Sequence, residues 1–221
     1  MSRIDSSLWI KICGLMQPTQ AVEIAALGAS AIGFICVPAS PRYVAPQQIQ
    51  LISDTFMAAG WADVERVGVF ADAASSDIHA AVTIGRLTTL QLHGKESPET
   101  CAQLRQAYPT LKIIKAFRIR ATADLASTAA YEASVDALLL DAYHPQLLGG
   151  TGQTLDWESL QAFKPTKPWY LAGGLKPENV QDALRKLTPD GIDVSSGVEV
   201  APGDKSVAKV KELLAAVRSM L

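Results

Sequence analysis

Short runs of apolar residues alternate with segments of helical spacing along the whole chain. The apolar runs are rich in Val, Ile and Leu and lack polar alternation, which is typical of strands buried on both faces of a parallel sheet. They predict eight strands, at residues 8–13, 31–35, 65–70, 88–92, 111–116, 136–140, 169–172 and 191–194.

Helical segments lie between these runs, and several open with a proline or with a Ser, Thr or Asp in the first turn. The uncharged stretch 24–41 reaches the minimum length of a membrane span, but Gly28, Gly33 and Pro38 interrupt it. We interpret it as the end of a helix, a turn and a buried strand. The clearest predicted helices are 46–59, 98–108, 177–187 and 205–220.

The repeated order of strand and helix predicts parallel crossover units, and eight such units predict a (β/α)₈ TIM barrel. A chain of 221 residues has room for one or two domains, but barrels of this size commonly form one, so we expect a single domain over 1–221. A doubly wound open sheet is the alternative. It would usually carry a Gly-x-Gly-x-x-Gly turn directly after the first strand, and residues 13–18 do not supply one.

Composition narrows the class of protein further. Apolar residues make up 48% of the chain and charged residues 19%, which suits a globular protein with a large core. The 20 basic and 22 acidic residues are scattered, so the basic surface of a nucleic-acid binder is missing. This distribution does not exclude a small anionic ligand, which local positive charge can bind. The N-terminus lacks the apolar core of a secretion signal, so we expect a cytoplasmic protein without a membrane segment. The sequence indicates no obligate protein partner.

The cysteines and histidines show no metal-binding spacing. The three cysteines are odd in number and far apart, which argues against both a disulfide framework and a CxxC site. The spacing of His79, His93 and His144 matches no zinc motif either. We therefore expect no metal, and we interpret Cys36 and Cys101 as inert packing residues.

Candidate chemistry gathers where the predicted strands end. In a barrel, the carboxyl ends of all eight strands form the rim that carries the active site. Cys13 ends the first strand and Asp141 follows the sixth. A thiol and a carboxyl at two strand ends suggest a base and an acid. The alternative for Cys13 is a small buried side chain without chemical function.

Glycine-rich segments after the last two strands predict a phosphate site. Backbone N–H groups in such segments can hold a phosphate at the start of a short extra helix. The alternative is that each glycine merely forms a tight turn. The residues concerned are Gly173 and Gly174 after the seventh strand and Ser195, Ser196 and Gly197 after the eighth.

Four further features belong to the same rim or lie close to it. The long loop after the sixth strand contains Gly150 within a glycine-rich run, and such loops are commonly functional. Arg42 follows a Ser-Pro turn and can receive a carboxylate in bidentate fashion, and the alternative is an ordinary surface arginine. His93 can hydrogen-bond a substrate or transfer a proton, but a lone histidine is more often structural. Lys11 inside a barrel needs an anionic partner, from the protein or from a ligand.

Taken together and in this order, the motifs resemble the phosphoribosylanthranilate isomerase family over almost the entire chain. The resemblance implies a cofactor-free Amadori rearrangement in tryptophan biosynthesis, from N-(5-phosphoribosyl)anthranilate to 1-(2-carboxyphenylamino)-1-deoxyribulose 5-phosphate. The matching motifs are Lys11-Ile12-Cys13-Gly14-Leu15, Gly33-Phe34 with Ser40-Pro41-Arg42, Val67-Gly68-Val69-Phe70, Gln91-Leu92-His93-Gly94, Leu139-Leu140-Asp141 with Gly149-Gly150-Thr151-Gly152, Leu171-Ala172-Gly173-Gly174-Leu175-Lys176-Pro177-Glu178-Asn179-Val180 and Asp193-Val194-Ser195-Ser196-Gly197-Val198-Glu199.

The resemblance also implies the roles of individual residues. Asp141 matches the general acid and Cys13 the general base, while Arg42 would bind the anthranilate carboxylate. The pKa of Asp141 should then be raised by partial desolvation, and Cys13 should reach the thiolate with help from a positive charge such as Lys11. The phosphate would be held by Gly173, Gly174, Ser195, Ser196 and Gly197, with His93 and Gly150 as further substrate-binding residues. Tyr143 and His144 receive no role.

Two other functions stay open. The related histidine-pathway sugar isomerase performs the same rearrangement on a larger substrate, but it typically has an aspartate at the position of Cys13. It would also be expected to have a second phosphate site, and the first half of this chain lacks a convincing one. The third function is that of a catalytically silent phosphate-binding scaffold, against which Cys13 and Asp141 argue because a binding module needs neither.

Overall fold

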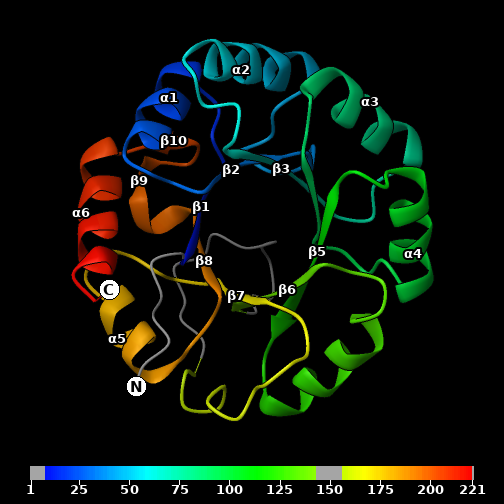
Figure 1. Ribbon diagram of the computed structural model, residues 1–221, viewed down its shortest axis with the longest axis vertical. Coiled ribbons are helices and arrows are strands. Elements are labelled where there is room, and N and C mark those ends of the chain that lie inside the picture. Colours follow the sequence, from blue (N-terminus) through cyan, green and yellow to red (C-terminus); the bar gives the residue numbers. More distant parts are fainter. Residues whose placement is uncertain (1–7, 143–155, 221) are drawn as a thin grey trace.

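The computed structural model describes residues 8–142 and 156–220, and its eight parallel strands close into a barrel (Figure 1). Each strand pairs with the next along the chain, and β1 pairs with β8 to complete the ring. Closure confirms the predicted barrel and excludes the open sheet, which would have two unpaired edges. The strands are β1 Trp9–Cys13, β2 Ala31–Ile35, β3 Glu65–Phe70, β4 Thr89–Leu92, β5 Lys112–Ile119, β6 Ala137–Ala142, β7 Trp169–Leu171 and β8 Gly191–Val194.

The predicted strands agree with the observed ones to within one residue, except at the carboxyl ends of β5 and β6. Both extend further toward the carboxyl rim than the apolar runs indicate, because their backbones stay paired up to Ile119 and Ala142. Arg118 pairs in register with Asp141, so the polar side chains do not end the ladder. Asp141 is therefore the second-last residue of β6 and does not belong to the loop after it.

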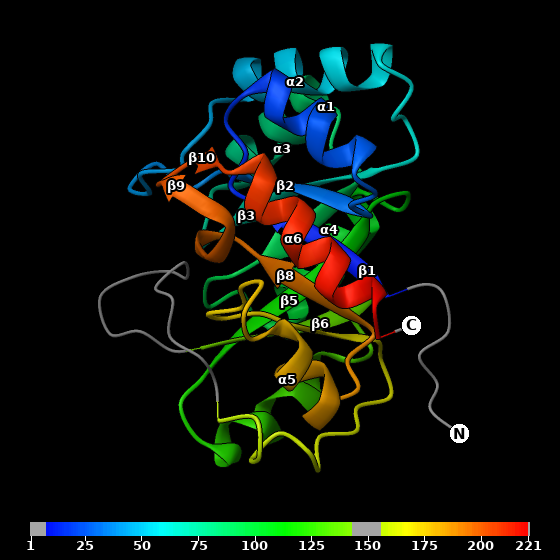
Figure 2. The ribbon, with the colours of Figure 1, turned by 90° about the vertical axis from the view of Figure 1, so that its left-hand side faces the viewer.

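Helices surround the barrel, as the two views at right angles show (Figures 1 and 2). Pro18, Pro46 and Pro98 begin α1, α2 and α4, where a proline costs no hydrogen bond because the first N–H groups of a helix have no partner in it. The helices are α1 Pro18–Ala26, α2 Pro46–Ala58, α3 Ser75–Gly85, α4 Pro98–Ala107, α5 Val180–Lys186 and α6 Val207–Arg218.

Two crossovers depart from the alternation of strand and helix. After β5 the chain forms a 3₁₀ helix, η1 Thr122–Tyr131, whose start is held by Asp124 accepting backbone N–H bonds from Arg120 and Ala121. Between β6 and β7, the described residues 156–168 form turns without a helix. Within the described ranges, no helix is long and apolar enough to cross a membrane.

Two predicted helices begin later than the sequence pattern indicates. The segment predicted as 177–187 becomes helical only at Val180, because Asn179 accepts from the Lys176 N–H, donates to the Gly174 carbonyl and so holds a turn. The segment predicted as 205–220 begins at Val207, where the Ser206 hydroxyl caps α6. Lys205 is not helical, because it belongs to β10 Asp204–Lys205, which pairs with β9 Glu199–Ala201.

Alternate residues of each strand face either the helices or the barrel interior. Ile10 and Ile12 of β1 belong to the large core between barrel and helices. Lys11 and Cys13 lie on the opposite face, toward the interior, where Leu139 packs two residues before Asp141. The fold thereby stacks apolar side chains inside the barrel and places chemical groups on top of them at the carboxyl rim.

Candidate active site

A cavity of about 370 Å³ opens among the loops at the carboxyl ends of the strands. Its lining brings together nine of the ten residues that the sequence predicts as site residues, although they come from distant parts of the chain. The tenth, Gly150, lies outside the described residues, as do Tyr143 and His144. The nine are Cys13, Arg42, His93, Asp141, Gly173, Gly174, Ser195, Ser196 and Gly197.

Cys13 ends β1 and is 5% exposed. Its backbone is held at the rim because the Ser195 hydroxyl donates to the Cys13 carbonyl over 3.0 Å. Burial raises the pKa of the Cys13 thiol, and the nearby charges of Lys11 and Lys205 oppose that rise without cancelling it. The expected help from Lys11 is therefore present, but it does not by itself make the thiolate the resting form.

Lys11 is completely buried and belongs to a polar network inside the barrel. Its ammonium group lies 3.1 Å from the Asp193 carboxylate, which stands opposite it in the register of β1 and β8, and it donates to the Gln91 side chain. Burial disfavours the ammonium charge, but attraction to Asp193 and Cys13 outweighs this and raises the pKa of Lys11. The anionic partner that Lys11 requires thus comes from the protein.

The sequence pattern did not identify Asp193 as a site residue. It lines the cavity, and among the described residues its buried Oδ1 atom has no hydrogen-bond partner. Burial raises the pKa of Asp193, and the charge of Asp141 adds to that effect. A carboxyl group within the apolar run Gly191–Val194 was the available signal, because charge in a strand facing a barrel interior requires a partner.

Asp141 and His93 lie beside each other in the cavity lining. Both are buried, and His93 Nε2 is 3.4 Å from Asp141 Oδ2 in a geometry that makes no hydrogen bond. The other ring nitrogen of His93 lies 3.4 Å from the Gln91 amide. Gln91 thus contacts both Lys11 and His93 and connects the surroundings of Cys13 with those of Asp141.

The glycine segments after β7 and β8 take the form expected of an anion site. Gly173 and Gly174 have φ values of +89° and +64°, in a backbone region that residues other than glycine rarely adopt. Ser196 begins the short 3₁₀ helix η2, Ser196–Val198, and a Cβ at Gly197 would collide with the Leu175 carbonyl oxygen. These glycines let the two loops pack closely while their backbones face the cavity.

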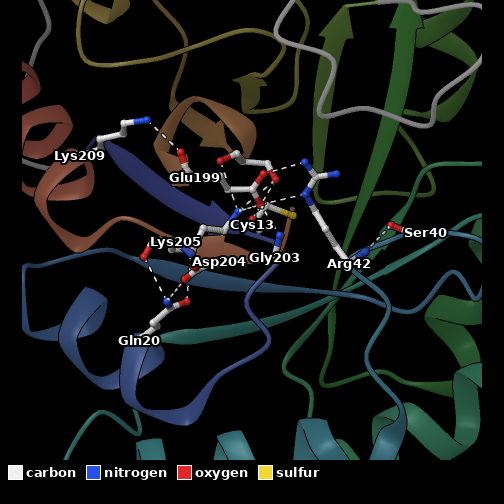
Figure 3. Close-up of polar contacts among 10 residues, drawn as sticks. Cys13, Gln20, Ser40, Arg42, Glu199, Gly203, Asp204, Lys205 and Lys209 are labelled. Atoms are coloured by element: carbon white, nitrogen blue, oxygen red, sulfur yellow. Dashed lines mark hydrogen bonds and ion pairs between the residues drawn. The ribbon is translucent and has the colours of Figure 1, made fainter. Parts of the chain in front are cut away.

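Arg42 reaches the cavity from the loop after β2, but a protein carboxylate already holds its guanidinium. Nε and Nη2 donate to the two Glu199 oxygens over 2.9 and 2.7 Å (Figure 3). Lys205 contacts the same carboxylate at 2.6 Å. Glu199 and Lys205 received no role from the sequence, because the ion cluster forms only when β9 and β10 fold over the rim beside the loop after β2 (Figure 2).

We expect the Glu199 cluster to make stability sensitive to acid. Burial alone would raise the pKa of Glu199, but Arg42 and Lys205 lower it from 4.5 to about 2. The ionised carboxylate therefore stabilises the folded state above pH 4.5, and this is lost as the pH falls toward 2. Denaturant titrations should show the stability difference between wild type and Glu199→Gln shrinking by about 1 to 3 kcal/mol over this window. A pH-independent difference would contradict the prediction.

Comparison with known proteins connects this cavity to a family. The model of the N-(5'-phosphoribosyl)anthranilate (PRA) isomerase family matches residues 10–216, which is nearly the whole described barrel. The chain belongs to this family. A phosphoribosylanthranilate isomerase from Rippkaea orientalis is 55% identical over 205 residues, which cover 93% of this chain and 94% of that protein.

Solved structures of the family share the whole barrel with this protein. The phosphoribosylanthranilate isomerase of Thermotoga maritima superposes with a TM-score of 0.86 at 32% identity, covering 96% of this chain and 99% of that one. The enzyme of Thermus thermophilus gives 0.84 at 33% identity, with 97% and 100% covered. A further structure, of a phosphoribosylanthranilate isomerase in complex with reduced 1-(o-carboxyphenylamino)-1-deoxyribulose 5-phosphate, gives 0.82 at 30% identity, with 96% and 99% covered.

Proposed function

We propose that Cys13 and Asp141 carry the proton transfers by which this phosphoribosylanthranilate isomerase converts N-(5-phosphoribosyl)anthranilate to 1-(2-carboxyphenylamino)-1-deoxyribulose 5-phosphate in tryptophan biosynthesis. One observation carries the proposal: both groups line a single cavity that is also lined by the glycine-rich segments after β7 and β8 and by Arg42, which Glu199 holds in place. The substrate has a phosphate at one end and a carboxylate at the other. The cavity therefore offers a site for each end and an acid and a base between them.

Ring opening is the first step and requires a proton on the ribose ring oxygen. We assign this proton to Asp141, which lies buried beside His93 on the wall of the cavity. As the ring C–O bond breaks, the nitrogen lone pair forms the C=N bond and leaves a protonated Schiff base. The Asp141 carboxylate that remains beside this cation favours its formation.

Removal of the C2′ proton is the second step, and we assign it to Cys13. The thiolate takes the proton, the C2′–H electrons form the C1′=C2′ bond, and the iminium nitrogen becomes neutral. Burial raises the pKa of the free thiol, so the positive charge of the iminium and of Lys11 must favour ionisation when substrate is bound. The enolamine then tautomerises to the ketone.

The two ends of the substrate would be held by groups on different loops. Arg42 has Nε and Nη2 bound to Glu199, while Nη1 has no partner among the described residues and stays available for the anthranilate carboxylate. We place the phosphate at the backbone of Gly173, Gly174, Ser196 and Gly197, beside the Ser195 side chain. A relative of the same fold has been solved with a reduced product, which supports a ligand of this class for the cavity.

A fluorescence assay that follows the loss of phosphoribosylanthranilate tests the function directly. The histidine-pathway aminoaldose, run in parallel, distinguishes the related sugar isomerase, and turnover of neither substrate would indicate a silent binding barrel. We expect turnover of phosphoribosylanthranilate. Localisation in the cytoplasm, action as one catalytic domain over 1–221 and the absence of an obligate protein partner complete the proposal.

Gly197→Ala should impair binding of the phosphate end. The new methyl group would meet the Leu175 carbonyl oxygen and force the loops after β7 and β8 apart. We expect KM for phosphoribosylanthranilate to rise by about 10- to 100-fold, the loss of one or two charge-assisted hydrogen bonds. Gly60→Ala is the control, because Gly60 has a positive φ, follows α2 and is not part of the cavity lining. It should lower stability and leave KM unchanged. An unchanged KM in Gly197→Ala would remove this segment from the phosphate site.

A further inference from the structure

We infer that Glu199 positions Arg42 for the carboxylate end of the substrate, an inference that rests on the proposed role of Arg42. The two residues lie 157 positions apart, Arg42 in the loop after β2 and Glu199 at the start of β9. Glu199 is 8% exposed and is absent from the cavity lining that Arg42 forms. It therefore acts through Arg42 and is a positioning residue.

The geometry of the pair restricts the guanidinium of Arg42. Both oxygens of Glu199 are used, one by Nε over 2.9 Å and the other by Nη2 over 2.7 Å. A bidentate carboxylate fixes both the plane and the rotation of a guanidinium, which a single hydrogen bond does not. Arg42 is thus held along one edge, and its opposite side, with Nη1, remains for a ligand in the cavity.

Glu199 is itself held from several directions (Figure 3). Its Oε1 atom accepts from Lys205 Nζ over 2.6 Å and from the Gly203 N–H over 3.0 Å, and its backbone carbonyl accepts from Lys209 over 2.9 Å. The Lys205 ammonium also lies 3.3 Å from both oxygens of Ser195. The same cluster therefore connects the arginine with the segment proposed to bind phosphate.

The charges of the cluster also favour a ligand with a carboxylate. Two buried or nearly buried cations, Arg42 and Lys205, share the single carboxylate of Glu199. An incoming carboxylate on Arg42 restores the balance without requiring the side chain to become ordered on binding. Without the Glu199 charge, Arg42 and Lys205 would repel each other, and the guanidinium would leave its position.

Paired ligands test the inference. The first is reduced 1-(o-carboxyphenylamino)-1-deoxyribulose 5-phosphate, and the second is the same molecule with an unsubstituted phenyl ring. In calorimetric titrations, Glu199→Gln should weaken binding of the first by about 10- to 100-fold and of the second by less than about 3-fold. Glu199→Asp, which keeps the charge on a shorter chain, should show a partial loss. In turnover assays KM should rise while kcat changes by less than about 3-fold.

Controls separate positioning from a general effect on the fold. Glu96→Gln also breaks a buried ion pair, with Lys115 at 3.1 Å, but Glu96 does not contact Arg42, so both ligands should bind as to wild type. Equal losses for both ligands in Glu199→Gln would overturn the inference. Equal losses in Arg42→Ala would instead contradict the proposed role of Arg42. If Glu199→Gln does not fold, an unchanged ratio of affinities in folded Glu199→Asp overturns the inference.

Discussion

Replacing Cys13 by alanine should lower kcat by roughly 10²- to 10⁴-fold and leave the barrel folded. The substitution removes one sulfur atom from the wall of the cavity and leaves the Cys13 backbone, with its hydrogen bond from Ser195, in place. The decrease in kcat comes from slower removal of the C2′ proton, so affinity for the reduced product analogue should change by less than about 3-fold. The fluorescence assay and calorimetry measure the two quantities.

The pH profile and a second cysteine provide the controls for this prediction. Burial raises the pKa of the Cys13 thiol above 9.0, so the wild-type rate should increase as the pH rises above neutrality, and the residual rate of Cys13→Ala should lack that increase. Cys101→Ala also removes a buried thiol, one whose pKa is raised to about 11 in the core under α4. It should cost stability and leave kcat intact. Near-normal turnover of Cys13→Ala would remove Cys13 as the base.

Asp141→Asn should lower kcat by a similar factor, roughly 10²- to 10⁴-fold, because asparagine has the same shape but no acidic proton. Asp141 is 5% exposed and lies against His93, so the amide can occupy the same space. We expect near-normal affinity for the reduced product analogue, in which the ring is already open. Single-turnover measurements should therefore show slow ring opening as the cause of the low kcat.

Asp136→Asn is the matched control for this variant. Asp136 directly precedes β6 and is bound to Arg105 at 2.8 Å and to the backbone N–H of Ile113, at the end of the barrel away from the cavity. The substitution should reduce stability and leave turnover unchanged. A kcat for Asp141→Asn within about tenfold of wild type would show that another group supplies the proton.

Much of the barrel could be predicted because its determinants are local. The apolar run 31–35 coincides with β2, since a strand buried on both faces needs only a continuous apolar segment, and 65–70 coincides with β3 although its first two residues are charged. The errors lie where a distant partner decides the structure. β5 extends past Ala116 because β6 pairs with it, and Lys205 forms a strand with β9 although its own neighbours favour a helix.

The candidate site likewise contains residues that the local sequence identified and residues that only contacts with distant parts of the chain identify. Strand ends and glycines identified Cys13, Asp141 and the two segments that we propose to bind phosphate, because in a barrel the carboxyl ends of all strands meet on one rim. Asp193 and Glu199 could not be assigned from position alone. Asp193 can be recognised only through its pairing with Lys11, which stands opposite it in the register of β1 and β8. Glu199 can be recognised only through its hydrogen bonds with Arg42.

The amino-acid sequence by itself determined the barrel and the chemical groups on its rim, because the spacing of apolar and polar residues along one chain encodes both, and its motifs carry the resemblance to the family. The tertiary structure decided how those groups are held and charged. Burial raises the pKa of Cys13, Asp193 partners Lys11, and Glu199 occupies one edge of Arg42. Each of these depends on distances between residues far apart in sequence, since desolvation and ion pairing act through space.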